Sequence, residues 1–241
     1  MNVARIDELT AQYETLLSEA VEANRQRTFY AHWPEIPSGK IYGETANADG
    51  ENTFKARLNR DFEELKQDGE YVMLGEEESP YGFSLGIRYP VFHEETLVAN
   101  AVKAGREWWG LTPQQRAAIL IETLERSARS FFEITYATMH TTGQGFMMAF
   151  QASGPHSYDR ALEAVAMGYS AQTFFATDVE WTKPMGKSAV VLKKKFRLVP
   201  KGIGLVVGCS TFPIWNSLPG MFASLVTGNP VIVKPHPRAV L

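Results

Sequence analysis

Cysteine is nearly absent from this sequence, whose 241 residues contain one, Cys209. A single thiol cannot close an internal disulfide, which points to a reducing compartment and predicts a cytoplasmic location. Also missing is any apolar run of about 18 residues, the length that predicts a membrane-spanning helix. The amino terminus, MNVARIDELTAQYE, is polar within ten residues and has no signal-peptide core. We therefore expect no membrane association.

Several ligand-binding signatures are missing as well. The sequence contains neither GxGxxG nor GxxxxGK[ST], the glycine patterns of dinucleotide-binding and phosphate-binding loops. The formal net charge of −3 argues against a dedicated nucleic-acid binder. The histidines are scattered without metal-ligand spacing, so we predict no metal site. They are His32, His93, His140, His156 and His236.

What the sequence does contain is typical of a globular protein. Hydrophobic residues make up 44% of it, aromatic residues 12% and charged residues 21%. At roughly 150 residues per domain, the length predicts one large domain or one and a half. Residues 1–90 hold 9 Lys and Arg against 17 Asp and Glu, whereas residues 91–241 hold 15 against 10. This asymmetry indicates two differently solvated surfaces, or an acidic part that packs over a basic, anion-handling part.

Hydrophobic spacing predicts mainly helices in the first two thirds of the chain. The clearest start signal is Thr112-Pro113 followed by Gln115, the pattern of a capping box with proline at the first helical position. Gly143 is placed to end that helical stretch in a left-handed conformation. The acidic run at 76–78 is interpreted as a solvated loop. We expect helices over 4–24, 53–67, 94–108, 113–142 and 157–174, and irregular chain over 30–50 and, with one edge strand, over 75–90.

The pattern changes late in the chain. Residues 189–192 and 196–199 are short and β-like, and 202–208, GIGLVVG, is a continuous apolar run typical of a buried parallel strand. A helix over 213–227 and a second buried strand over 230–233 complete a βαβ unit. The predicted fold class is α/β, with N-terminal helices before the first βαβ unit of an open, Rossmann-like parallel sheet. Two strands leave faces and edges uncovered, so we expect the front part of a longer, truncated sheet.

Ligands of an open α/β sheet gather beyond the carboxyl ends of its strands. Residues 208–213, GCSTFP, leave the first predicted strand, and residues 234–238, KPHPR, leave the second. The first segment offers small side chains and a helix N-terminus, whose free N–H groups favour an anion or a carbonyl oxygen. The second offers up to three cationic groups suited to ribose hydroxyls and phosphates. The alternative interpretation of both segments is two ordinary loops.

From residue 200 onward, PKGIGLVVGCSTFPIWNSLPGMFASLVTGNPVIVKPHP resembles the first nucleotide-binding unit of the aldehyde dehydrogenase superfamily, whose motif runs strand, P-W-N-F-P, helix and G-N-x-V-[VI]-x-K-P. Upstream, AVKAGREWWGLTPQQRAAILIETLERSARSFFEI is similar to the paired early helices of that superfamily, and residues 140–144, HTTGQ, resemble its E-T-G-K turn. The resemblance covers about residues 94–241. It is strongest to a branch associated with bacterial catabolism of aromatic acids such as phenylacetate.

The resemblance implies an oxidoreductase that converts an aldehyde or semialdehyde to an acid with NAD or NADP. The superfamily lysine that contacts the adenosine ribose corresponds to Lys234. The superfamily glutamate three residues later, which contacts the same ribose, corresponds to Pro237. Without that carboxylate, and with His236 and Arg238 near, a 2′-phosphate meets less repulsion, which favours NADP. The oxyanion-hole asparagine falls on Thr211, whose hydroxyl can donate one hydrogen bond. The predicted cofactor-binding residues are Gly208, Cys209, Ser210, Lys234 and His236.

The reactive cysteine and the general-base glutamate of the superfamily lie downstream of these motifs, so the resemblance places neither in this sequence. Cys209 stands at the superfamily's proline position, and we interpret it as a small packed thiol, with a replacement nucleophile as the alternative. The chain alone is therefore expected to be inactive. Two other functions stay open, namely a non-catalytic fragment or interaction module, and a CoA-acylating aldehyde dehydrogenase.

The predicted organisation has three parts. An acidic, helical and irregular segment covers 1–93, a helical part of the nucleotide-binding domain covers 94–180, and an edge hairpin with the first βαβ unit covers 181–241. The resemblance implies a homo-oligomer that acts on a small aldehyde, with a subunit-contacting hairpin near 193–197. The alternative interpretation of that run, KKKFR, is a patch that binds nucleic acid.

Overall fold

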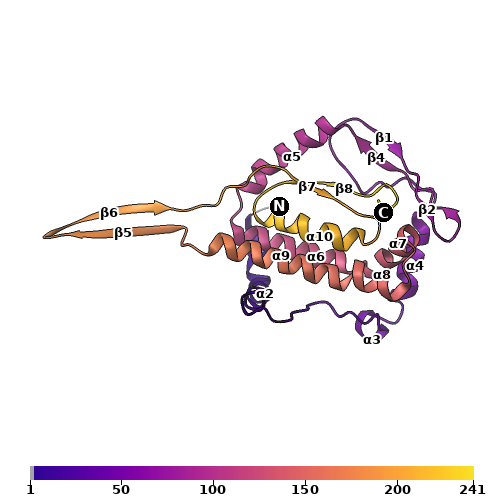
Figure 1. The fold of residues 1–241 in the computed structure, drawn as a ribbon, viewed down its shortest axis with the longest axis horizontal. Helices are drawn as coiled ribbons and strands as arrows, with labels where there is room; N and C mark the ends of the chain where they lie inside the picture. Colours follow the sequence, from indigo (N-terminus) through magenta and orange to yellow (C-terminus); the bar gives the residue numbers. More distant parts are fainter. Residues whose placement is uncertain (1–2) are drawn as a thin grey trace.

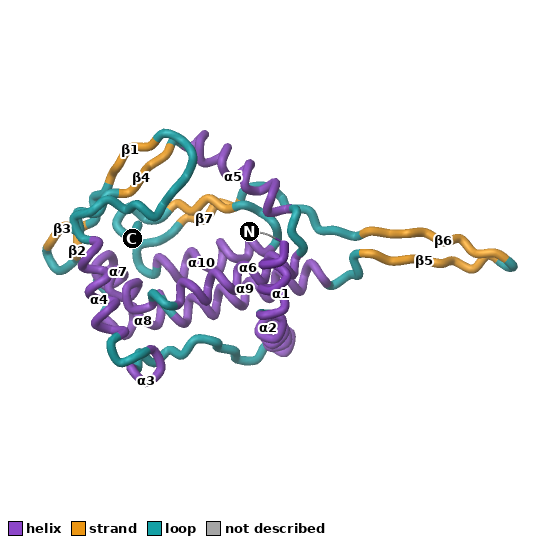
Figure 2. Tube along the Cα trace, turned by 180° about the vertical axis from the view of Figure 1, so that it is seen from behind, coloured by secondary structure: helices purple, strands orange, loops and turns teal. Residues whose placement is uncertain are grey.

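A computed structural model describes residues 3–241 and shows a helical body with small sheets around it (Figures 1 and 2). The helices are α1 (Val3–Gln12), α2 (Glu14–Gln26), α3 (Gly39–Tyr42), α4 (Ala46–Arg57), α5 (Glu94–Trp109), α6 (Pro113–Ala128), α7 (Phe131–Thr142), α8 (Phe146–Ser153), α9 (Pro155–Thr173) and α10 (Pro213–Val226). The strands are β1 (Tyr71–Leu74), β2 (Glu78–Ser79), β3 (Phe83–Ser84), β4 (Tyr89–Phe92), β5 (Asp178–Met185), β6 (Ser188–Lys195), β7 (Gly204–Val207) and β8 (Val231–Lys234). None of these helices is long and apolar enough to cross a membrane.

The strands of residues 3–241 form four two-stranded sheets, namely β1–β4, β2–β3, β5–β6 and β7–β8. The first three pairs are antiparallel, whereas β7 and β8 run parallel, with Gly204 opposite Val231 and Val207 opposite Lys234. Helix α10 connects β7 to β8, so the predicted βαβ unit is present at its expected place. The expectation that both strands are buried is wrong, because their residues are half-buried or exposed, with Leu205 68% and Val207 58% exposed. The predicted α/β fold class is confirmed.

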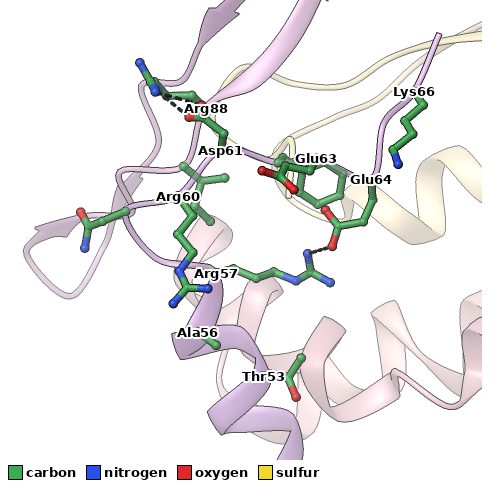
Figure 3. Close-up of a pocket in the computed structure, with 12 residues that line it drawn as sticks. Thr53, Ala56, Arg57, Arg60, Asp61, Glu63, Glu64, Lys66 and Arg88 are labelled. Carbon is green, nitrogen blue, oxygen red and sulfur yellow. Dashed lines mark hydrogen bonds and ion pairs between the residues drawn. The ribbon is translucent and has the colours of Figure 1, made fainter.

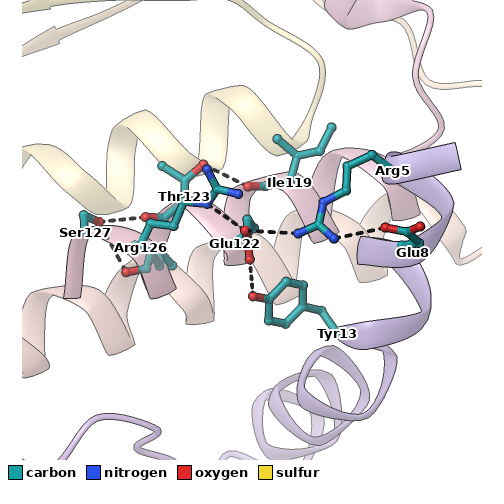
Figure 4. Close-up of polar contacts among 9 residues, drawn as sticks. Arg5, Glu8, Tyr13, Ile119, Glu122, Thr123, Arg126 and Ser127 are labelled. Carbon is teal, nitrogen blue, oxygen red and sulfur yellow. Dashed lines mark hydrogen bonds and ion pairs between the residues drawn. The ribbon is translucent and has the colours of Figure 1, made fainter. Parts of the chain in front are cut away.

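The expected single helix over 4–24 is instead two helices that meet at Tyr13. Backbone angles of φ −102° and ψ 8° at Tyr13 end α1 and begin α2 in a new direction. Its ring is buried against the core, and its hydroxyl donates a hydrogen bond to Glu122 of α6, as Figure 4 shows. Burial and the neighbouring Glu122 carboxylate both raise the pKa of the Tyr13 phenol. The bend thus lets one aromatic side chain reach α6, a contact that helical periodicity alone does not specify.

The main core lies between the N-terminal helices and α6 to α10. Leu9, Ile121 and Val165, from α1, α6 and α9, are all fully buried in it. Burial of such side chains is favourable by about 25 cal/mol per Å² of apolar surface. Phe222 and Val226 bring α10 into the same cluster. The helix that links β7 to β8 therefore rests on a packed helical support, which fixes where the two strands end.

The capping box is confirmed atom by atom. Thr112 Oγ1 accepts from the backbone N–H of Gln115 at 3.2 Å, and the Gln115 side chain accepts from the Thr112 N–H at 3.0 Å. The expected helix over 113–142 is divided into α6 and α7 by a break at residues 129–130. Gly143 ends α7 at φ 80°, in the predicted left-handed conformation.

The interpretation of the acidic run as a solvated loop is wrong for its middle residue. Glu77 is 2% exposed, and its carboxylate accepts from the N–H of Val240 at 2.5 Å and from the N–H of Leu241 at 3.3 Å. The Tyr89 hydroxyl donates to its other oxygen. A buried carboxylate with three donors is a structural anchor. It joins the β2 region to the last residues of the sequence, a pairing that local composition cannot reveal.

Other local expectations need correction. The stretch 30–50 contains α3 and the start of α4, the expected helix over 53–67 ends at Arg57, and 75–90 contains β2, β3 and the start of β4. The prediction of a strand over 196–199 is wrong. The two strands of the hairpin are β5 and β6, which lie within residues 178–195. Figures 1 and 2 show this hairpin projecting from the body. Both strands are exposed along their whole length, so they lack the buried face that makes a strand visible in a sequence.

Candidate functional site

The loops that leave β7 and β8 lie side by side. Because the strands are parallel, their carboxyl ends meet at one edge, where the Gly208 N–H donates to the Lys234 carbonyl at 2.9 Å. A Cβ on Gly208 would lie 3.2 Å from Ser217 Oγ of α10 and 3.4 Å from Pro235 Cα. Glycine at this position therefore allows the two loops and α10 to approach one another closely. The geometry places predicted residues of both loops at one edge.

Within the first loop, a thiol and a hydroxyl face each other. Cys209 Sγ lies 3.5 Å from Thr211 Oγ1, and the Phe212 N–H donates to the same sulfur at 3.5 Å. Burial alone raises the pKa of the Cys209 thiol. The hydrogen bonds from the Thr211 hydroxyl and from backbone N–H groups of residues 209, 211 and 212 outweigh it, so the pKa lies below that of an ordinary cysteine. The loop thus gathers hydrogen-bond donors around the Cys209 sulfur.

A side chain from another part of the molecule completes this loop. Gln144 follows α7, and its Nε2 donates to the Thr211 carbonyl oxygen. The sequence predicts no role for Gln144 in the site, although Gln144 stands in the turn at 140–144 that resembles the E-T-G-K motif. The bond spans 67 positions of sequence, so spacing could not predict it.

The second loop is a compact turn. Residues 236–239 close on themselves, since the Ala239 N–H donates to the His236 carbonyl at 2.9 Å and the Arg238 N–H donates to His236 Nδ1 at 3.2 Å. The side chains of Lys234 and Arg238 are exposed, whereas His236 is half-buried. Glu77 holds the segment that follows. Lys234, the last residue of β8, and Arg238, in the turn, therefore place two exposed cations at this loop.

These residues suit a nucleotide. Exposed ammonium and guanidinium groups such as those of Lys234 and Arg238 can bind phosphate and ribose oxygens. Ser210 lies between Cys209 and Thr211, at the same edge of the sheet. Among residues 3–241 there is no group of three or more His, Cys, Asp or Glu arranged to hold a metal ion.

Two large open grooves lie elsewhere. One of about 990 Å³ runs between α4 and the loop before β1, where Figure 3 shows Arg57 paired with Glu64 and Arg88 paired with Asp61. Because these opposite charges satisfy one another, this groove offers little net charge to a ligand. A second groove of about 960 Å³ lies between α5 and β8 and is largely apolar. Neither groove is lined by residues 208–212 or 234–238, so neither includes the candidate site.

Comparison with known proteins identifies the family of the chain. The model of the aldehyde dehydrogenase family matches residues 93–241. A crystal structure of an NAD-dependent aldehyde dehydrogenase from Burkholderia multivorans is 48% identical, with a TM-score of 0.92 over 97% of this chain and 42% of that one. A 1-pyrroline-5-carboxylate dehydrogenase from Thermus thermophilus is 16% identical, with a TM-score of 0.62 over 88% and 40%, and shows the fold alone. No curated protein is similar enough to count as a match.

Proposed function

Since the chain belongs to the aldehyde dehydrogenase family, we propose that its protein oxidises an aldehyde to an acid with a nicotinamide cofactor. The chain spans 42% of the Burkholderia multivorans enzyme, so the proposal concerns the activity of the whole protein. Residues 94–241 would supply the front part of a nucleotide-binding domain, and the acidic, helical and irregular segment 1–93 packs against it through α1 and α2. This sequence would not supply the nucleophile.

The loop 208–212 carries the proposal. It places the Thr211 hydroxyl, a thiol with a lowered pKa and the N-terminus of α10 at the carboxyl end of β7. The Thr211 hydroxyl, turned from the Cys209 sulfur to the substrate, and the free N–H groups at the start of α10 would stabilise the oxyanion that forms when a nucleophile adds to an aldehyde carbonyl. The cofactor would accept hydride from that adduct. Gly208, Ser210, Lys234 and His236 would border the cofactor, and Cys209 would support the loop.

The first test replaces Thr211 in the active protein and measures aldehyde-dependent reduction of NAD and NADP. Thr211→Val removes the hydroxyl at nearly constant shape, and we expect kcat to fall on the order of a hundredfold. Thr211→Ser keeps the hydroxyl and should retain most of the activity. A wild-type rate for Thr211→Val would contradict the oxyanion role. If no aldehyde supports turnover by the wild-type protein, the dehydrogenase function is wrong and an interaction module becomes the better interpretation.

The same assay separates two products. An acid as product supports hydrolytic release, whereas an acyl-CoA formed only with CoA present indicates the CoA-acylating alternative.

For the cofactor, we propose a preference for NADP over NAD. Lys234 and Arg238 place two cations at the loop after β8, and Pro237 stands where a carboxylate would repel a 2′-phosphate.

Replacement of Pro237 by glutamate tests that preference. We expect Pro237→Glu to weaken NADP binding about tenfold and to change NAD binding about threefold or less, because the new charge faces the 2′-phosphate. Titration calorimetry measures both affinities without turnover. Pro237→Gln is the matched control, since it also removes the proline but adds no charge. Equal weakening of both cofactors by Pro237→Glu would contradict the assignment.

We further propose a semialdehyde from aromatic-ring catabolism as substrate, because the sequence resembles phenylacetic acid degradation protein N, an aldehyde dehydrogenase associated with bacterial catabolism of aromatic acids. Aromatic rings lie next to the Thr211 loop, where Phe212 and Trp215 have ring centroids 5.6 Å apart and His156 and Trp215 are separated by 4.7 Å. Trp215 is 38% exposed. Such a surface suits a flat apolar substrate.

The β5–β6 hairpin supports a homo-oligomer. It exposes apolar side chains on both strands, among them Trp181 and Val191, and has uncovered strand edges. Exposed apolar side chains of this kind mark contact surfaces. The Lys-rich run at its end includes Lys194, whose ammonium lies 4.2 Å from the Trp181 ring centroid. Subunit contact through this arm is therefore our proposal, in preference to nucleic-acid binding.

A further inference from the structure

The position of Thr211 depends on how the loop 208–212 is held. At one end the Gly208 N–H donates to the Lys234 carbonyl, and at the other the Asn216 N–H donates to the Phe212 carbonyl at 2.9 Å as α10 begins. Thr211 lies between these two points. There the Gln144 side chain donates to its carbonyl oxygen. Gln144 thus restrains the peptide group between Thr211 and Phe212, next to the Thr211 side chain.

Gln144 itself stands on a rigid support. Its N–H donates to Thr142 Oγ1 at 3.2 Å, and Thr142 Oγ1 in turn donates to the Thr138 carbonyl at 2.7 Å, one turn back in α7. Gly143 ends that helix in a left-handed conformation, which turns the chain toward the loop. A donor mounted on a packed helix restricts the loop more than a donor on a mobile segment would.

The oxygen of the Gln144 side-chain amide has no hydrogen-bond donor as a partner in the part of the chain that the structure describes. Gln144 Oε1 is buried and accepts no hydrogen bond within residues 3–241. A buried acceptor without a partner is unfavourable. The benefit of glutamine at this position therefore comes from its donor, the group that contacts Thr211.

We propose that Gln144 is a positioning residue that holds Thr211 in its oxyanion-binding orientation, an inference that rests on the proposed function. A displacement of about 1 Å at a reacting group can reduce turnover strongly. Loss of the Gln144 donor should leave binding of aldehyde and cofactor nearly unchanged, because Gln144 acts through Thr211.

The thiol of Cys209 reports on the loop without any need for turnover. Its reactivity depends on hydrogen bonds from Thr211 and Phe212, so a loosened loop should raise its pKa toward that of a free cysteine. We expect Gln144→Met to slow alkylation of Cys209 by iodoacetamide at neutral pH about twofold or more, and to move the pH midpoint upward. Mass spectrometry of the peptide that carries Cys209 measures the rate across pH.

The second measurement is steady-state kinetics of the active protein. Gln144→Met should lower kcat about tenfold and change KM about twofold or less. Gln144→Lys restores a donor and removes the unpartnered acceptor. It should therefore recover most of the Cys209 alkylation rate and most of kcat. Gln151→Met is the matched control, because Gln151 also donates to a backbone carbonyl, that of Glu35 at 3.4 Å, away from the loop.

The outcomes separate the two proposals. An unchanged alkylation profile in Gln144→Met overturns the role of Gln144, whatever the activity. A changed profile with an unchanged kcat overturns it as well. If the wild-type protein oxidises no aldehyde, the proposed function fails, and the thiol measurement alone then decides whether Gln144 fixes the Thr211 loop.

Discussion

Arg116→Met is expected to lower the free energy of unfolding by about 2–4 kcal/mol, since it deprives buried acceptors of their donors. The Arg116 side chain is almost fully buried in α6. It donates to the carbonyl oxygens of Val226 at 2.9 Å and Leu111 at 2.5 Å, and to Gln172 Oε1 at 2.8 Å. Val226 keeps a second donor, Gln172 Nε2 at 3.0 Å. The largest costs of the substitution therefore come from the Leu111 carbonyl oxygen and Gln172 Oε1, which lose the Arg116 donor.

The desolvation cost of the buried charge opposes this loss of stability. Burial disfavours the charged guanidinium and lowers the pKa of Arg116, so removal of the charge recovers part of the desolvation cost. We expect the lost hydrogen bonds to dominate, because Arg116 also supports the turn at Gly228, where a Cβ would lie 3.6 Å from Arg116 Cζ. That turn leads from α10 into β8 and so to Lys234.

Urea unfolding followed by circular dichroism measures the effect. Arg129→Met is the matched control, since Arg129 is exposed next to the end of α6 and its replacement should change stability by about 0.5 kcal/mol or less. Arg116→Lys keeps the charge but cannot make three divergent hydrogen bonds, and should fall between the two. Equal stability of Arg116→Met and the wild type would show that desolvation, not hydrogen bonding, dominates at this site.

Local signals in the sequence were sufficient wherever the stabilising partners are close in the chain. Thr112 and Gln115 are three positions apart, and their reciprocal hydrogen bonds formed as predicted. The apolar runs of β7 and β8, separated by one amphipathic helix, likewise predicted a parallel pair. These features depend on periodicity and capping, which a short window of sequence contains.

Contacts between distant parts of the chain could not be predicted in this way. Glu77 looked solvated because its neighbours are acidic, yet its partners Val240 and Leu241 lie 163 and 164 positions away. Tyr13 bends a helix to reach Glu122, 109 positions later. Gln144 contacts Thr211 by the same kind of long-range bond. The rule that ligands gather at strand ends predicts the candidate site, but it does not identify Gln144, the side chain that contacts the loop 208–212.

Gly50→Ala is expected to destabilise the protein by about 2 kcal/mol or more, although alanine is normally the better helix former by about 1 kcal/mol. Gly50 lies in α4 where this helix crosses α7. A Cβ there would lie 2.7 Å from the backbone nitrogen of Glu133 and closer still to Phe132 Cβ. Backbone atoms of a packed helix cannot move aside as the end of a flexible side chain can, so α4 and α7 would have to separate.

The contrast with a second helical glycine isolates this crossing as the cause. Gly220 lies in α10, and a Cβ there would meet nothing nearer than Val206 Cγ2 at 3.8 Å. Gly220→Ala should therefore leave stability unchanged or raise it by up to about 1 kcal/mol. Thermal and urea unfolding of both variants give the difference. If the two substitutions shift stability in the same direction and by similar amounts, backbone propensity alone governs both positions, and the close packing of α4 on α7 is not what requires glycine at position 50.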